Sequence, residues 1–365
     1  MNILDFGAKR GEFCGDAIQR AIDAAAVQGG GRVVVPAGEY ETASLVLRSN
    51  VELHLEAGAV LRFTDDFDAY PVVNIRWEGY EQPCRRPLIY AKNEVNVALT
   101  GFGTLEGQGK KWWTAFRAKT LDAARPCAVC FEDCTRVRMS DFMVHNSPNW
   151  TIHPVRCENV TIDNLTIVNP FDSPNTDGID PESCRNVRIT GCHIDVGDDC
   201  IAVKAGTEDA LEDVPCENIA ITGCTMVHGH GGVVLGSEMS GGIRRVSITG
   251  CVFDGTDRGI RIKSRRGRGG AVEDVSVTGI VMNDVLCPLV INLMYFCGKD
   301  GKLPIVSDPN AQPVTDATPH VRRIRMADIV VTNAKSAAAC LYGLPEAPLE
   351  DISIVNTQIH LVEDT

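Results

Sequence analysis

Short segments that alternate apolar and polar residues recur along the chain from about residue 90 onward. Eight of them begin at Val137, Val160, Val187, Ile219, Val246, Val275, Ile324 and Ile352. Their first residues are separated by 23, 27, 32, 27, 29, 49 and 28 positions. Alternation with a period of two is typical of β-strands, and a repeat of roughly 20 to 50 residues indicates a solenoid.

The pattern predicts an all-β fold, a right-handed parallel β-helix. The leucine spacing of horseshoe repeats and the Trp-Asp signature of propellers are absent from the sequence. An amphipathic run after Asp16 predicts a short helix that ends near Gly29 and caps the first coil, with strands beginning at Val33. We expect one domain over residues 1–365, with the cap at about 1–32 and a polar, proline-bearing insertion near 299–319.

Seven of the 15 cysteines follow the same repeat. One set lies three residues before the strand starts, and a second set lies five residues after them: Cys134, Cys157, Cys184 and Cys216, then Cys192, Cys224 and Cys251. Equal offsets place like residues above one another in stacked coils. We therefore expect two internal ladders of free thiols, with Cys acting as a small buried hydrophobe, and no disulfides.

The amino-acid composition disfavours two classes of binding partner. With 35 basic and 48 acidic side chains the formal charge is −13, so nucleic acid and anionic membranes are disfavoured as ligands. No apolar run approaches the roughly 18 to 20 residues needed to cross a bilayer. The start of the sequence has no features of a secretory signal, which favours a cytoplasmic protein. A monomer is the default expectation for a capped solenoid.

Three carboxylates are predicted to cluster. Asp177 precedes Asp198 by the length of one coil, and Asp199 follows directly. Adjacent strand residues point to opposite faces, so both can face a cleft only if the chain bends near Gly197. Crowded carboxylates raise at least one pKa and supply an acid beside a base, as glycoside hydrolysis requires. A turn-forming cluster and a calcium site are the alternatives.

The following coils add an imidazole and two cations. His230 follows Asp198 by one coil length, and Arg261 follows His230 by another. Arg261 and Lys263 share one strand face, and beside an acidic cluster they indicate an anion-binding site. A solvated edge strand is the alternative interpretation.

Two further patterns suggest metal sites, and neither is complete. Cys127, Cys130 and Cys134 have cluster-like spacing, but Cys134 belongs to a ladder and no fourth thiolate is near in sequence. His228 and His230 have no clear third ligand. We expect no metal and no cofactor.

The complete motif set resembles the polygalacturonases, family 28 of the glycoside hydrolases. The resemblance rests on four signatures that stand in order: Asn175-Thr176-Asp177, Gly197-Asp198-Asp199, Gly229-His230-Gly231 and Arg261-Ile262-Lys263. Residues 5–9 and 29–38 also look like the opening of the family.

The resemblance implies an inverting, metal-independent hydrolase of α-1,4-galacturonosyl bonds. Asp198 would be the general acid, and Asp177 and Asp199 would activate the water. His230 would join the carboxylate network and help hold the acid protonated. The residues implied to contact substrate are Arg261, Lys263, Asn175 and Tyr295. Inverting enzymes separate acid and base by roughly 6.5 to 9.5 Å, which neighbouring coils can provide.

Substrate choice and mode of attack stay open at this point. The intact Arg-Ile-Lys signature favours galacturonate, because relatives that act on the rhamnogalacturonan backbone lack it. A cytoplasmic enzyme would meet imported pectic oligomers, which favours exo action. Exo action needs loops that close one end of the groove. The candidates are residues 65–87, with Trp77 and Tyr80, and residues 106–126, with Trp112 and Trp113. The alternatives are an endo-polygalacturonase, a hydrolase of xylogalacturonan or rhamnogalacturonan, a calcium-dependent pectate lyase, and a non-catalytic glycan-binding β-helix.

Overall fold

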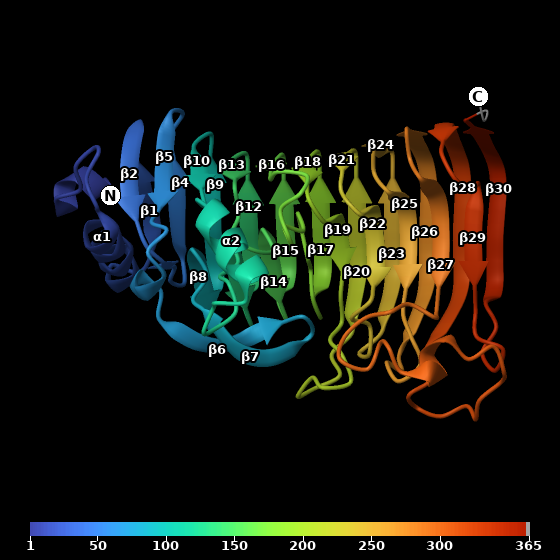
Figure 1. Ribbon diagram of the computed structural model, residues 1–365. Helices are drawn as coiled ribbons and strands as arrows, with labels where there is room; N and C mark the ends of the chain where they lie inside the picture. The colour runs from blue at the N-terminus through green and yellow to red at the C-terminus, as the bar shows by residue number, and fades with distance from the viewer. Residues whose placement is uncertain (363–365) are drawn as a thin grey trace.

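The computed structural model describes residues 1–362 and is a right-handed parallel β-helix with three strand faces (Figure 1). The first face contains β1 (Gly31–Val35), β4 (Val51–Leu55), β9 (Val95–Gly101), β12 (Thr135–Ser140), β15 (Glu158–Asp163), β17 (Arg185–Thr190), β20 (Cys216–Thr222), β23 (Ile243–Thr249), β26 (Ala271–Asn283), β28 (His320–Ala334) and β30 (Glu350–Leu361). The second contains β2 (Gly38–Thr42), β5 (Ala59–Phe63), β10 (Thr104–Glu106), β13 (Met143–His145), β16 (Thr166–Val168), β18 (His193–Val196), β21 (Thr225–His228) and β24 (Val252–Asp254), which pairs with the later half of β26.

The third face carries the functional site described below. It contains β3 (Leu45–Val46), β8 (Ile89–Lys92), β11 (Val129–Glu132) and β14 (Ile152–Val155), followed by β19 (Asp199–Val203), β22 (Gly231–Gly236), β25 (Arg258–Lys263), β27 (Cys287–Asn292) and β29 (Ala339–Tyr342). Single bridges from Ile152 to Ile179 and from Ile179 to Ile201 join the two groups. The third face is therefore continuous, but between β14 and β19 it consists of isolated bridges.

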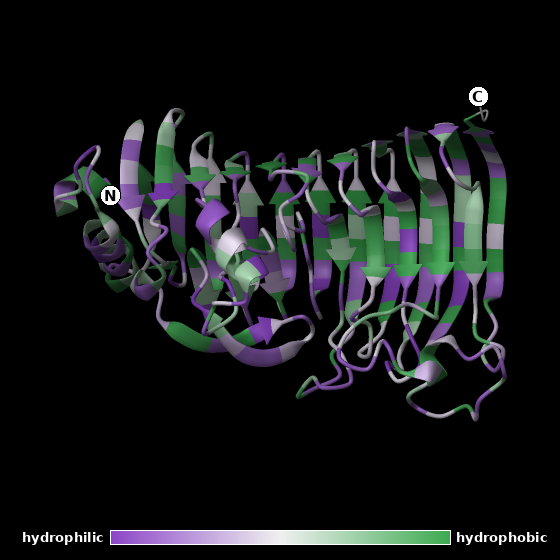
Figure 2. Cartoon of the chain, viewed as in Figure 1, coloured by the Kyte–Doolittle hydropathy of each residue, from purple (hydrophilic) through white to green (hydrophobic). Residues whose placement is uncertain are grey.

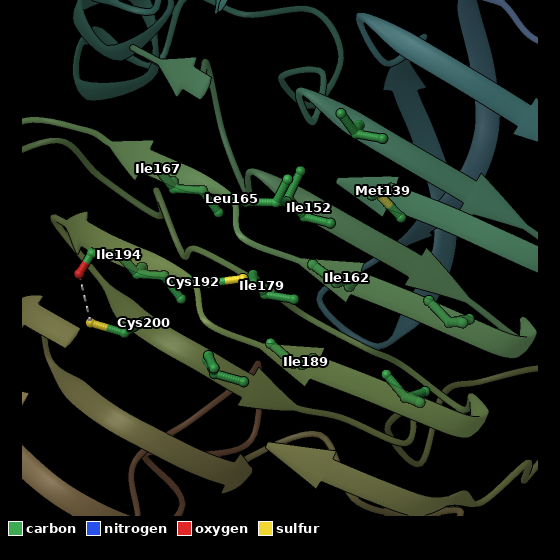
Figure 3. Packing of buried hydrophobic residues seen from close by; sticks show 14 of the residues in the cluster. Met139, Ile152, Ile162, Leu165, Ile167, Ile179, Ile189, Cys192, Ile194 and Cys200 are labelled. Atoms are coloured by element: carbon green, nitrogen blue, oxygen red, sulfur yellow. Dashed lines mark hydrogen bonds between the residues drawn. The ribbon is translucent and has the colours of Figure 1, made fainter. Parts of the chain in front are cut away.

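The predicted strand register is confirmed residue by residue. Val137 pairs with Val160, Val160 with Val187, and the series continues without a slip to Ile324 and Ile352. Side chains at these positions point inward and stack above one another, as Figure 3 shows for the aliphatic residues of neighbouring coils. Apolar and polar residues alternate along strands of the first face such as β26 and β28 (Figure 2). Burial of each such aliphatic side chain contributes about 1.5–3 kcal/mol, and this repeated burial stabilises the fold.

A helix closes the N-terminal end, as predicted. Helix α1 (Gly15–Val27) begins one residue before Asp16 and buries Ala17, Ile18, Ala21, Ile22 and Ala25 against the first coils. A second helix, α2 (Lys110–Ala118), and three 3-10 turns, Ile3–Phe6, Phe67–Ala69 and Pro304–Ser307, lie outside the strand stacks. No helix within residues 1–362 has the length and apolar character needed to span a bilayer. The assignment of the whole chain to one domain stays a prediction.

The cysteines lie as predicted. All 15 are free, and 13 of them are buried. The register places Cys134, Cys157, Cys184 and Cys216 at equivalent positions of successive coils, just before or at the start of paired strands. Burial raises the pKa of Cys157 and Cys200 well above the ordinary value, which keeps these thiols protonated.

This arrangement predicts a thiol titration in two stages. In the folded protein Ellman's reagent should react with about two thiols, because only Cys297 and Cys340 are partly exposed. In denaturant without reductant it should react with all 15. Rapid labelling of most thiols in the folded state would contradict the buried ladders, and fewer than 15 in denaturant would reveal disulfides.

Candidate active site

The three predicted carboxylates meet where the chain turns from the second face to the third. Strand β18 ends at Val196, Gly197 and Asp198 form a bend, and β19 begins at Asp199. A side chain at Gly197 would lie 2.5 Å from the Ser173 carbonyl oxygen, so only glycine fits this bend. The bend expected from the sequence is present, and it lets two adjacent aspartates take part in one site.

One carboxylate oxygen from each of Asp177, Asp198 and Asp199 lies within 4.8 Å of the others. The carboxylates are therefore closer than the roughly 6.5 to 9.5 Å usual for inverting hydrolases, and spacing alone does not indicate inversion. Within residues 1–362 this group of side chains is also close enough to hold a metal ion. Lysine and arginine side chains already contact it, as described next.

The strand register differs in detail from the coil spacing read from the sequence. Gly178 N donates to Asp199 O, and Ile179 pairs with Ile201, so Asp177 lies directly beside Asp199 on the neighbouring coil. Asp199 pairs with Gly231, which places His230 beside Asp198.

Arg261 does not lie beside His230, because it pairs with Val234. Its side chain reaches back, and Nη1 donates to His230 O at 3.4 Å. The side chain, and not the strand register, therefore brings Arg261 to the site.

Two cations contact Asp199. Lys263 Nζ lies 2.6 Å from Asp199 Oδ2, and Arg261 Nη1 lies 3.7 Å from Asp199 Oδ1. Burial lowers the pKa of Lys263, but the charge of Asp199 outweighs this effect and the pKa is raised. Lys263 is therefore a permanent cation next to the carboxylates.

His230 pairs with Asp198. Its Nδ1 lies 3.1 Å from Asp198 Oδ1, and its ring is half exposed. The hydrogen bond to Asp198 raises the pKa of His230. Burial raises the pKa of Asp198, but the hydrogen bond and charge of His230, with Lys263 and Lys204, outweigh it and lower the pKa. In the free protein His230 therefore favours the ionised form of Asp198, contrary to the expectation that it holds this carboxyl protonated.

Asp177 is in the opposite electrostatic situation. It is almost completely buried, and burial together with the charge of Asp198 raises its pKa well above the ordinary value. The cluster therefore contains two neighbouring carboxyl groups whose pKa values are shifted in opposite directions. In the free protein these directions are the reverse of the roles that the resemblance implies, with Asp198 as the acid and Asp177 as a base.

Three charged residues of this site were missed in the sequence. Lys204 follows β19 and lies 3.8 Å from Asp177, 3.6 Å from Asp180 and 3.3 Å from Glu238, measured from Nζ to the nearest carboxylate oxygen. The side chain of Lys204 also lies over the ring of Trp150, at 4.4 Å. None of these residues belongs to a signature, and only the strand register brings them together.

The two remaining predicted substrate contacts also lie at the site. Asn175 lines the cavity, and its Oδ1 accepts a hydrogen bond of 2.7 Å from Arg125 Nη2. Tyr295 lines the cavity too, and its ring lies 5.1 Å from the Arg261 guanidinium and 5.3 Å from Lys263 Nζ. The structure thus brings all eight predicted residues into one region, although His230 and Arg261 contact the carboxylates from outside the cavity lining.

The cavity has a volume of about 570 Å³. The antiparallel hairpin of β6 (Val72–Trp77) and β7 (Tyr80–Arg85) contributes Glu78 and Tyr80 to its lining, so the expectation for residues 65–87 holds for Tyr80. It does not hold for Trp77, which is buried against Trp150. No residue from 106–126 is in the lining, so that expectation was wrong: Trp112 is buried against Phe67 and Tyr70. Other wall residues come from the segments after β19, β22, β25 and β27, whose approach to the cavity was not predicted: Thr207, Glu208, Asp209, Ser237, Glu238, Arg268 and residues 296–299.

Comparisons with known proteins identify the family. The family model described as "Glycosyl hydrolases family 28" matches residues 31–359. A probable polygalacturonase of Vitis vinifera is 37% identical over 343 residues, which cover 92% of this chain and 68% of the grape protein. This chain therefore spans about two-thirds of that relative.

Two solved structures have the same fold over nearly the whole chain. A hyperthermoactive exopolygalacturonase from Thermotoga maritima has a TM-score of 0.82 and 31% identity, covering 98% of this chain and 91% of that one. A polygalacturonase from Erwinia carotovora has a TM-score of 0.79 and 25% identity, covering 97% and 92%. On the family match, the relatives and the shared fold, this chain belongs to family 28 of the glycosyl hydrolases and is a glycoside hydrolase.

Proposed function

We propose that this protein hydrolyses α-1,4 bonds between galacturonate units, with inversion, and removes units from one end of the chain. Hydrolysis of galacturonan is supported by the polygalacturonase relatives and by the buried carboxylate cluster beside two cations. Arg261 and Lys263 are placed to bind a sugar carboxylate, which a neutral sugar lacks.

In the proposed mechanism Asp198 protonates the glycosidic oxygen. It is the member of the cluster whose side chain is partly exposed, and it lines the cavity. The proton to be delivered is shared between Asp198 and His230 through their hydrogen bond. Lys263 is one of the charges that lower the pKa of Asp198. A substrate carboxylate bound to Lys263 would offset that charge and favour protonation of Asp198 in the complex.

Asp177 and Asp199 are proposed to orient and deprotonate the attacking water. Asp199 is anchored by Lys263, and Asp177 lies beside it on the preceding coil. Asn175 and Tyr295 are proposed to contact the sugar rings from the cavity wall.

The observation that carries exo action is the position of the β6–β7 hairpin. The hairpin packs over the outer side of β8, β11 and β14 and covers Tyr90, Cys130 and Val155. Within the hairpin Arg76 pairs with Glu81 at 2.8 Å. Two contacts join the hairpin to the coils: Arg76 lies 3.9 Å from Glu182, and Arg156 lies 3.2 Å from Glu81. Figure 1 shows the hairpin on the N-terminal side of β19. We propose that a sugar chain extending along the third face toward the N-terminal coils would meet it there.

The hairpin tip is joined to the other walls of the cavity. Thr207 N donates to Gly79 O at 3.0 Å. Glu208 accepts from Arg268 at 2.6 Å, and Lys299 contacts Asp209 at 2.7 Å. These contacts link the hairpin to the segments after β19, β25 and β27, which supports the proposal that they close one end of the groove together.

The test is a time course on tri- and hexagalacturonate, with products separated by size. We expect early release of galacturonate and of the oligomer shortened by one unit. A spread of intermediate oligomers would show endo action instead. Proton NMR of the first product should show the β-anomer, and the reaction should continue in chelator without ultraviolet absorbance from a new double bond; absorbance lost with chelator would indicate a lyase.

We also propose that the enzyme works in a reducing compartment, the cytoplasm. The free, stacked cysteines support this proposal. There the substrate would be imported oligomers. Fractionation of the native host, with the enzyme detected by antibody, tests this location.

A further inference from the structure

Lys204 lies at the centre of the buried charges below the cleft. Its side chain is 4% exposed, and its Nζ lies within 4 Å of Asp177, Asp180 and Glu238. Both oxygens of Asp180 lack a hydrogen-bond partner within residues 1–362. A buried carboxylate without a partner is costly, so these acids depend on a neighbouring cation.

Lys204 is held in place from three directions. Its stem continues from β19, Lys204 N donates to Pro181 O at 2.9 Å, and its ammonium lies over the Trp150 ring. Lys204 borders the cavity, but its ammonium is almost fully buried among the carboxylates. It therefore acts on catalysis through the carboxylates that it contacts.

We propose that Lys204 is a positioning residue: its fixed positive charge holds Asp177 in place and favours the ionised form that activates water, and Glu238 partly offsets this charge. This proposal rests on the proposed function. Glu238 shares Lys204 with the two aspartates and lines the same cavity. The pair therefore adjusts the charge of the carboxylate cluster.

The directions of the pKa shifts agree with this geometry. Burial and the charges of Asp198 and Asp180 raise the pKa of Asp177, and Lys204 lowers it. Burial raises the pKa of Glu238, but Lys204, Arg268 and Lys263 lower it to about 2, so Glu238 is ionised. The other charged groups that face the cluster from surrounding elements are Asp199, Glu78 and Arg125.

The test compares the pH dependence of kcat/KM in three variants. Lys204→Met removes a cation, so Asp177 should stay protonated to higher pH and the acidic limb should move up by roughly one pH unit or more. Glu238→Gln removes an anion, so the limb should move down. In the double variant Lys204→Met/Glu238→Gln the limb should return toward its wild-type position.

Opposite shifts of the acidic limb in the two single variants distinguish this electrostatic role of Lys204 from a purely structural one. If Lys204 only supported packing, both single variants would lose activity with the limb unmoved, and that result would overturn the proposal. Lys204→Arg, which keeps the charge, should retain the wild-type limb.

A second readout does not depend on activity. Because the pKa values of Asp177 and Asp180 are raised on folding, these groups bind protons in the folded state, and stability falls as pH rises through the interval between the unfolded and folded values. Lys204→Met should extend this fall to higher pH in chemical denaturation. An unchanged upper end of the fall would contradict the proposal, whereas an inactive wild-type enzyme with an extended fall in the variant would contradict only the proposed function.

Discussion

Replacing Asp198 with asparagine is expected to lower kcat by a factor of about 100 to 10,000, with oligogalacturonide binding largely intact. Asparagine has the same shape but cannot deliver a proton to the glycosidic oxygen, and general acid catalysis contributes a factor of this size. Turnover measured with trigalacturonate and binding measured by calorimetry check the two parts. Near-normal turnover would refute the assignment of Asp198 as the acid.

The chain contains a matched control for this substitution. Asp195 pairs with His228 Nδ1 at 2.9 Å, three residues before Asp198 and with the same kind of contact as the Asp198–His230 pair. Asp195 does not line the cavity. Asp195→Asn should therefore leave kcat within a small factor of wild type, so a large loss only in Asp198→Asn is specific to the site.

Replacing Lys263 with alanine is expected to reduce kcat/KM for galacturonate oligomers by on the order of 100-fold or more. Lys263 lies 2.6 Å from Asp199 and is almost fully buried. Its removal takes away a partner for the substrate carboxylate and leaves Asp199 with only the longer contact to Arg261. Loss of one member of a buried, hydrogen-bonded charge pair costs about 2–5 kcal/mol.

The result is checked by comparing KM and kcat on galacturonan and on neutral galactan. Lys263→Ala should lose most of the discrimination between the two. Lys335→Ala removes a cation from an exposed pair with Asp284 and should change neither parameter. An unchanged preference for the acidic substrate would contradict the role of Lys263.

The parts of the fold that repeat could be read from the sequence. Inward positions in a parallel β-helix must be apolar on every coil, so the series from Val137 to Ile352 specifies the strands and their register together. The bend at Gly197 could be predicted because two adjacent aspartates cannot otherwise share one face. The other site residues were predicted mainly from the four signatures.

Turn lengths limited what the sequence could show. Counting one coil onward from His230 leads to Arg261, yet the strand partner of Arg261 is Val234, because the turns between strands differ in length from coil to coil. Lys204, Asp180 and Glu238 have no local pattern that marks them as partners, since each contact depends on strands that meet only in the fold. The walls of the cavity depend on irregular segments, for which periodicity carries no information.

Strands and turns have different roles in this site, and the difference affects how the substrate of such an enzyme can change during evolution. The reacting groups are fixed by pairing between successive coils, whereas the cavity walls come from the β6–β7 hairpin and the segments after the strands. Insertions and deletions are tolerated in turns far better than in strands. Evolution can therefore lengthen, shorten or recombine these turns to open the groove or admit a branched sugar, while the inherited chemistry stays unchanged.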